Sequence, residues 1–297
     1  MKHIFTLALL ILACIRSEAQ MPLVLSDDTI QIGSSMLPAL SADIPEVDYD
    51  ITLKEWVKNL ESGTKSKVVT ENGVMSIFGA NIKKISANPI NVYSTLTKYD
   101  EMVRLSASFE PRKDEYITKD VAEADYMNAQ NYLKEFAKDR YIDFAKGEAD
   151  AEEKKLRDLQ KELSSLEREK SKMQRGIRKD NTSILREQEN IVAWNNELRT
   201  LASALALAKQ ELSLMDPGPA QKEKQAAVRD LEKRQRKAKK SIESAERKIK
   251  KANSKIDGAT KDIPKNENMQ GKLKEEIAKQ EAVFRTYDDK LQKIKSY

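Results

Sequence analysis

Hydrophobic residues recur with a seven-residue period through most of the second half of the chain. With Leu156 at heptad position a and Leu159 at position d, nine heptads run unbroken to Met215, and fifteen of their eighteen a and d positions are apolar. A second series starts with Val228 at a and Leu231 at d, and isoleucine at a then alternates with alanine at d. About three or four such heptads are enough for a coiled coil. The pattern therefore predicts two long coiled-coil helices.

The two series are separated by Asp216-Pro217-Gly218-Pro219, a segment that does not favour a continuous helix. We interpret it as the tip of one hairpin rather than as a linker, because the small alanines of the second series allow a facing helix to approach closely. The predicted hairpin has arms at residues 118–215 and 220–297 and a tip at residues 216–219. We expect Pro264 to kink or break the second arm locally.

Three polar residues interrupt the first apolar seam: Lys170, Asp180 and Glu187. Folding the arms antiparallel about the centre of the tip places Asp180 opposite Lys255 and Glu187 opposite Lys248. Charge pairs of this kind select the register of a coiled coil more than they stabilise it. We therefore expect these residues to act as register devices.

The same fold-back brings the C-terminal residues Tyr287, Leu291 and Ile294 level with Tyr141 and Phe144. Aromatic residues are scarce elsewhere in the two arms. A small aromatic cluster is therefore expected to tie the C-terminal end of the chain to the base of the hairpin.

Shorter patterns before the hairpin predict a small domain at residues 49–112. A helix is predicted from Thr52 as its N-cap, and the Asn72-Gly73 dipeptide predicts a tight turn between two β-rich runs. Apolar residues alternate between Val103 and Phe109, as expected for a strand with one buried face. We expect one helix against a four-stranded antiparallel meander. With the hairpin, the fold class is α+β and predominantly α.

The segment that precedes this domain shows no sustained period. Residues 20–48 contain Pro22, Gly33, Pro38 and Pro45, which favour turns and irregular backbone. We interpret them as an extended N-terminal segment with one short strand between Thr29 and Ile32.

Residues 1–19 have the layout of a signal peptide, with a short basic start, an apolar run and small residues before the cut after Ala19. The apolar run is about a dozen residues, shorter than the roughly 20 that span a membrane. We expect an exported protein, periplasmic or secreted, of a bacterial cell envelope. The alternative is a membrane-anchored lipoprotein, because Ile11-Leu12-Ala13-Cys14 resembles a lipobox in which Cys14 is lipidated.

Removal of this signal changes the available chemistry. It takes away His3 and Cys14, which are the only histidine and the only cysteine in the sequence. Imidazole is the commonest acid–base group near neutral pH, and imidazole and thiolate are the usual zinc ligands. The rest of the sequence contains no phosphate-binding loop, nucleophile elbow or metal-binding helix motif. We therefore expect a protein that is not an enzyme and uses no cofactor and no metal.

Two leucines near the tip stand outside the predicted seam. Leu207 and Leu214 both occupy position c, seven residues apart on one face of the first arm. An apolar stripe that the hairpin does not need predicts contact with a protein partner or with another copy. The competing interpretation is that Ala and Leu occur here only because both have high helix propensity, without making any contact.

The second arm contains a strongly basic stretch. Eleven basic and two acidic residues lie between Lys233 and Lys255. We interpret it as a solvated helix face partly paired with the first arm, and the alternative is binding of anionic surface polymers or lipid head groups. We expect no nucleic acid, because no aromatic residue for base stacking is interleaved.

A second functional hypothesis places the activity in the small domain. There, the β meander would hold a small ligand or glycan, and the coiled coil would serve as a spacer. The polar and aromatic candidates are Tyr93, Tyr99 and Arg104, whose types also suit ordinary packing on a strand.

Overall fold

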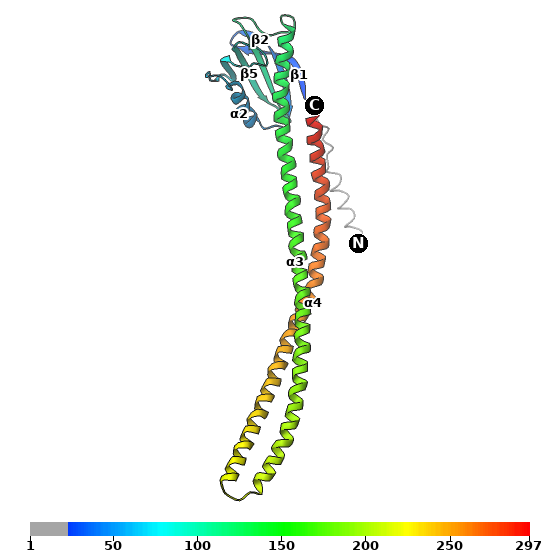
Figure 1. Cartoon of the computed structure of the whole chain (residues 1–297). Helices are drawn as coiled ribbons and strands as arrows, with labels where there is room; N and C mark the ends of the chain where they lie inside the picture. The colour runs from blue at the N-terminus through cyan, green and yellow to red at the C-terminus, as the bar shows by residue number, and fades with distance from the viewer. Residues whose placement is uncertain (1–22) are drawn as a thin grey trace, which may run out of the picture. The chain divides into compact units, whose positions relative to one another are not determined.

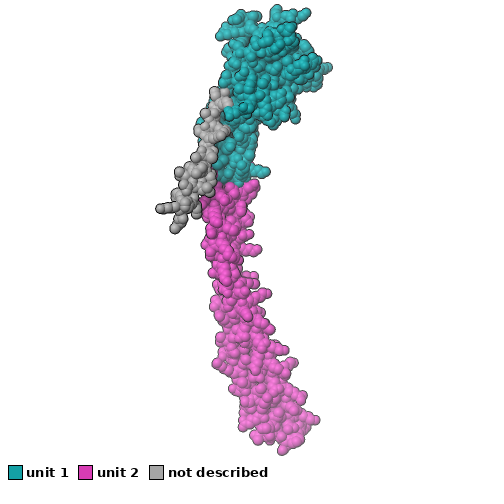
Figure 2. Space-filling view, turned by 180° about the vertical axis from the view of Figure 1, so that it is seen from behind, with its two compact units in different colours: residues 1–156, 280–297 teal, residues 157–279 magenta. Residues whose placement is uncertain are grey.

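The computed structural model describes residues 23–297. The predicted signal peptide, His3 and the lipidation candidate Cys14 lie outside these described residues. The described residues form two compact units, one made of residues 23–156 and 280–297 and the other of residues 157–279 (Figure 2). Helices α3 (Glu123–Ser213) and α4 (Pro219–Lys295) each contribute to both units.

The first unit contains a six-stranded antiparallel sheet with the strand order β1-β2-β6-β5-β4-β3. Figure 1 shows this sheet beside α2 and the start of α3. Strands β3 to β6 are the antiparallel meander expected within residues 49–112, but the expectation that the sheet has four strands in all was wrong. The strands are β1 (Val24–Ile32), β2 (Ser35–Pro45), β3 (Val69–Glu71), β4 (Val74–Ala80), β5 (Ile90–Lys98) and β6 (Met102–Glu110).

The two additional strands lie in the segment that we had interpreted as extended. Strand β1 is at the edge of the sheet, so it has few buried residues and no clear alternation. Strand β2 pairs with β1 along one side and, from Leu40 onward, with β6 along the other. Pro38 lies before the β6 pairing begins and Pro45 is the last residue of β2, so the sheet tolerates both prolines.

One face of the sheet is covered by α2 (Tyr49–Leu60) and by the first turns of α3. Trp56 is fully buried there, with its ring centroid 4.9 Å from that of Phe136 and 6.0 Å from that of Tyr132. The Trp56 indole Nε1–H donates to Ser94 Oγ on β5 at 2.9 Å. An aromatic cluster thus joins both helices to the sheet.

The C-terminal turns of α4 complete the core of the same unit. Ile294 is fully buried and Leu291 nearly so, in one cluster with Tyr141 of α3. Beside them, Lys290 forms ion pairs with Glu46, which follows β2, and with Glu148 of α3. Burial lowers the pKa of Lys290, but the hydrogen bonds from its ammonium to the two carboxylates prevail and leave the pKa raised.

In the second unit, α3 and α4 run antiparallel and are joined by residues 214–218, so the long helical hairpin is confirmed. The small seam residues Ala238, Ala245 and Ala252 are buried, as close approach of the two helices requires. Helix α3 starts at Glu123, five residues later than the predicted arm.

Pro264 lies inside α4 and does not end the helix, so of the expected kink or break the break does not occur. A proline removes one backbone hydrogen bond in the preceding turn. Buried seam residues on both sides of it, Ala252 and Asn266 among them, hold α4 against α3. This packing accounts for the continuous helix.

Candidate functional site

The hairpin brings some of the predicted register residues together. Lys248 Nζ donates to Glu187 Oε1 at 2.8 Å, across the seam and opposite as the fold-back requires. The hydrogen bond from Lys248 lowers the pKa of the Glu187 carboxyl below its ordinary value. Lys170 instead pairs with Glu267 at 2.7 Å. Within residues 23–297, no ion pair is formed by Asp180 or by Lys255.

A second polar feature of the seam was missed by the sequence analysis. Asn266 and Gln270 are both buried, and Gln270 Nε2 donates to Asn266 Oδ1 at 2.7 Å. They occupy d and a positions of the second heptad series, next to Glu267, the partner of Lys170. The sequence signal that could have revealed this feature is a polar residue at each of these two normally apolar positions. With Lys170 and Glu267 they form a polar section of the seam.

Large apolar side chains are exposed along the outer face of α3. We define the tip stripe as the four such residues between 185 and 214, which occupy b and c positions, outside the seam. Their exposed fractions are large: Leu185 62%, Val192 60%, Leu207 58% and Leu214 80%. Leu207 and Leu214 were the predicted contacts, and Leu185 was missed because a charged residue follows it at position c.

A groove of about 560 Å³ lies between the two arms of the hairpin, beside the tip stripe. Its lining consists of Val192, Asn195, Asn196, Leu198, Arg199, Ala202, Gln235 and Lys239. Gln235 stands at position a of the second heptad series, between Val228 and Ile242. The groove lies on the flank of the seam, where the seam residues Leu201 and Ala238 remain buried.

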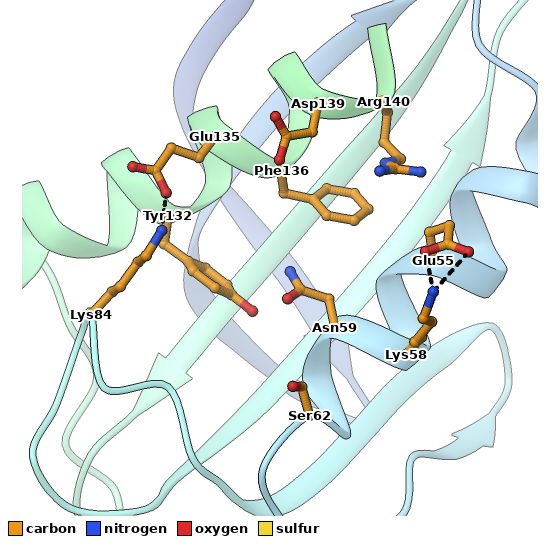
Figure 3. A pocket seen from close by; sticks show the side chains of 10 residues that line it. All are labelled: Glu55, Lys58, Asn59, Ser62, Lys84, Tyr132, Glu135, Phe136, Asp139 and Arg140. Atoms are coloured by element: carbon orange, nitrogen blue, oxygen red, sulfur yellow. Dashed lines mark hydrogen bonds and ion pairs between the residues drawn. The ribbon is translucent and has the colours of Figure 1, made fainter. Parts of the chain in front are cut away.

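The first unit has a polar pocket of about 280 Å³ between α2 and α3 (Figure 3). It is lined by Glu55, Lys58, Asn59, Ser62, Lys84, Tyr132, Glu135, Phe136, Asp139 and Arg140. Lys58 pairs with Glu55, and Lys84 pairs with Glu135 across the pocket. Within the described residues, the Tyr132 hydroxyl and Arg140 Nε are buried without a hydrogen-bond partner.

The burial of Tyr132 has an electrostatic consequence. Its side chain is only 8% exposed, and this burial raises the pKa of the phenol above its ordinary value. The hydroxyl therefore stays protonated and remains a hydrogen-bond donor across the physiological range.

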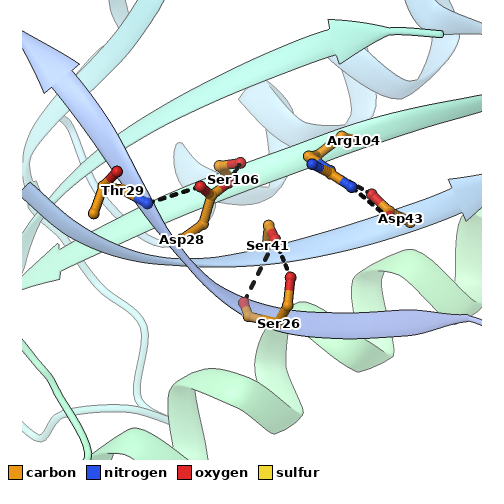
Figure 4. Close-up of polar contacts among 7 residues, drawn as sticks. All are labelled: Ser26, Asp28, Thr29, Ser41, Asp43, Arg104 and Ser106. Atoms are coloured by element: carbon orange, nitrogen blue, oxygen red, sulfur yellow. Dashed lines mark hydrogen bonds and ion pairs between the residues drawn. The ribbon is translucent and has the colours of Figure 1, made fainter.

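The three residues predicted to hold a ligand lie on strands β5 and β6 or between them, away from this pocket. Arg104 forms a bidentate ion pair with Asp43, at 2.6 and 2.8 Å (Figure 4). Its guanidinium also lies over the ring of Tyr99. Tyr93 donates from its hydroxyl to Glu110 at 3.1 Å. Burial and that hydrogen bond raise the pKa of Tyr93 to about 12. The structure thus joins Tyr99 and Arg104 but places Tyr93 in a separate network.

Between residues 23 and 297, no three His, Cys, Asp or Glu side chains gather as ligands for a metal ion. In the same range, no helix combines the length and apolarity needed to cross a bilayer.

No protein-family model matches this sequence, and no curated protein matches it. Three chains among solved structures do match. One of them is the crystal structure of a coiled-coil segment of Smc from Pyrococcus yayanosii. That chain is 20% identical to this one with a TM-score of 0.39, and the match covers 53% of this chain and 69% of the Smc segment.

Proposed function

We propose that this protein is a non-catalytic interaction protein whose coiled-coil hairpin associates with a second copy of itself through the tip stripe. The observation that carries this proposal is the exposure of Leu185, Val192, Leu207 and Leu214 on one side of α3. Removing one such side chain from water contributes about 1.5–3 kcal/mol before the costs of association. A hairpin that only needed to pair its own arms has no use for this stripe.

The distribution of charge favours a second copy as the occupant of the stripe. Between residues 182 and 213, α3 carries three basic and four acidic residues, so two such faces meet without strong repulsion. The opposite arm, between Lys233 and Lys255, carries eleven basic and two acidic residues. Two α4 faces therefore repel each other, which directs association to α3.

The proposal includes a location outside the cytoplasm, in a bacterial cell envelope. It is supported by the basic, apolar and small-residue pattern of residues 1–19. Intact-mass measurement of the protein recovered from cells tests it. A mass lacking residues 1–19 agrees with export, and a chain beginning at a lipid-modified Cys14 identifies the lipoprotein alternative. An uncleaved chain contradicts both.

The test of self-association is the double variant Leu207→Lys/Leu214→Lys, compared with the wild type by multi-angle light scattering. We expect the wild type to form a dimer at micromolar concentration and the variant to be monomeric with unchanged helical circular dichroism. The matched control is Met269→Lys/Val283→Lys, which places the same charges at two exposed apolar positions of α4. A wild-type monomer, or dimers of equal affinity in all three proteins, contradicts the proposal.

A second candidate function is supported by the pocket between α2 and α3. Two buried donor atoms without a hydrogen-bond partner, the Tyr132 hydroxyl and Arg140 Nε, and the half-buried Asn59 suit a small polar ligand such as a sugar. The other end of the Arg140 guanidinium pairs with Asp143 at 2.9 Å. Thermal shift with a panel of mono- and disaccharides tests this candidate. A shift that is lost in Asn59→Leu and kept in Asn195→Leu, at the other groove, supports it, and no shift with any sugar contradicts it.

A further inference from the structure

The basic stretch of α4 is concentrated on the face that points away from the seam. We define the basic face as its seven basic residues at heptad positions b, c and f: Lys233, Arg236, Lys237, Lys240, Arg247, Lys250 and Lys251. All seven are exposed. They follow one side of the helix over about 27 Å, since each residue adds about 1.5 Å. Glu243 is the one acidic residue at these positions in the same stretch.

The first arm does not neutralise this face. Among the described residues, two of the eleven basic side chains between 233 and 255 form an ion pair, Arg234 with Glu197 and Lys248 with Glu187. Both pairs use g positions, which flank the seam. The b, c and f residues are thus left to solvent. We expected the first arm to pair with part of the basic stretch. It does so at the g positions beside the seam, and not on the basic face.

We propose that the basic face binds the surface of a membrane rich in anionic phospholipid. The face is convex and covers about 100° of the helix, because b and c positions flank f at roughly 60° and 40°. A flat array of phosphate groups can approach all seven cations at once. The Lys and Arg side chains are long enough to reach a plane from this arc. Polybasic helices of this kind adsorb to anionic bilayers by charge.

The composition of the basic face also favours a bilayer over a nucleic acid as its ligand. The b, c and f positions between Arg229 and Ser254 carry no aromatic residue, so unpaired bases have nothing on which to stack. The major groove of a duplex is about 12 Å wide and admits a single helix. Here α3 is packed against α4 along its length in this unit. The same positions carry no apolar residue, so binding is electrostatic and involves no insertion.

The test is cosedimentation of the full chain with vesicles of phosphatidylcholine containing about 30% phosphatidylglycerol. We expect binding that is absent from pure phosphatidylcholine and that weakens steeply with salt. The triple variant Lys233→Gln/Lys240→Gln/Arg247→Gln removes the f-position charges. It should weaken binding by about 10-fold to 100-fold.

The matched control is Lys261→Gln/Lys272→Gln/Lys279→Gln. It makes the same charge change on the same helix at exposed lysines outside the basic face, and should bind vesicles within about twofold of wild type. Equal weakening in both variants, no binding to anionic vesicles, or tighter binding to inorganic polyphosphate or duplex DNA than to vesicles overturns the proposal. The f-position variant keeps Leu207 and Leu214, so its oligomeric state measured by light scattering should equal that of the wild type. A loss of vesicle binding in this variant is then distinguishable from a loss of self-association.

Discussion

At the scale of single residues, the most heavily bonded side chain of the sheet is Glu110. It is nearly buried and accepts hydrogen bonds from Asn91 Nδ2 at 2.8 Å, from the Tyr93 hydroxyl at 3.1 Å and from the Asp114 amide at 2.8 Å. Burial alone raises the pKa of a carboxyl, but here the three donors outweigh burial and the pKa of Glu110 lies below its ordinary value. The charged form is therefore the one that the fold stabilises.

The direction of this pKa shift predicts how the stability of the fold depends on pH. A group with a depressed folded-state pKa stabilises the fold above its ordinary pKa of about 4.5, and this contribution is lost as the pH falls through the folded-state pKa. We expect Glu110→Gln to lower the free energy of unfolding by about 1–3 kcal/mol at pH 7, because the amide cannot accept from every donor. Between pH 5 and pH 3, the variant should lose less stability than the wild type.

The measurement is urea unfolding followed by the fluorescence of Trp56, in a Trp194→Phe background that removes the second tryptophan. Glu71→Gln, at an exposed position on β3, is the control and should match the background at every pH. If Glu110→Gln and the background lose stability in parallel as the pH falls, the carboxylate of Glu110 is not the stabilising form.

At the scale of elements, the tight turns and the heptads were the features most readily predicted from sequence. Asn72 and Gly73 join β3 to β4 with φ of 50° and 81°, the left-handed conformations that this dipeptide favours. The N-cap of α2 was predicted wrongly. Asp48, four residues before Thr52, accepts from the Ile51 amide and starts the helix, because an aspartate oxygen satisfies this donor before the apolar stripe begins.

A glycine-to-alanine substitution is expected to change the free energy of unfolding in opposite directions in a turn and in a helix. Gly73→Ala puts a Cβ on a left-handed residue and should lower the free energy of unfolding by about 1 kcal/mol. Gly147→Ala lies inside α3 and should raise it by up to about 1 kcal/mol, because alanine is the better helix former. An added Cβ meets no atom within 4 Å at either site, so neither change reflects a clash. Urea unfolding measures both, and shifts of the same sign contradict this account.

At the scale of the whole chain, periodic features were predictable and isolated ones were not. The heptad phase placed Ile294 near Tyr141, and both are buried in one cluster. The ion pair from Lys290 to Glu46 joins residues 244 positions apart and follows no period, so the sequence offered no signal for it. The pocket between α2 and α3 escaped prediction for the same reason. Its lining comes from three segments whose spacing is set by packing of Trp56 and Phe136.

The end of the chain is predicted to stabilise the first unit. Ile294 is fully buried one residue before α4 ends, in the same hydrophobic cluster as the sheet core. Ile294→Ala removes buried methyl groups without reducing helix propensity, and should lower the free energy of unfolding by about 2–4 kcal/mol. The neighbouring Lys293→Ala, at an exposed position, should leave it within about 0.5 kcal/mol of wild type. Urea unfolding monitored through Trp56 measures both. Equal urea midpoints for the two variants would mean that the last turn of α4 does not stabilise the sheet core. A loss of stability confined to Ile294→Ala shows that the core is complete only when the C-terminal residues have packed against it.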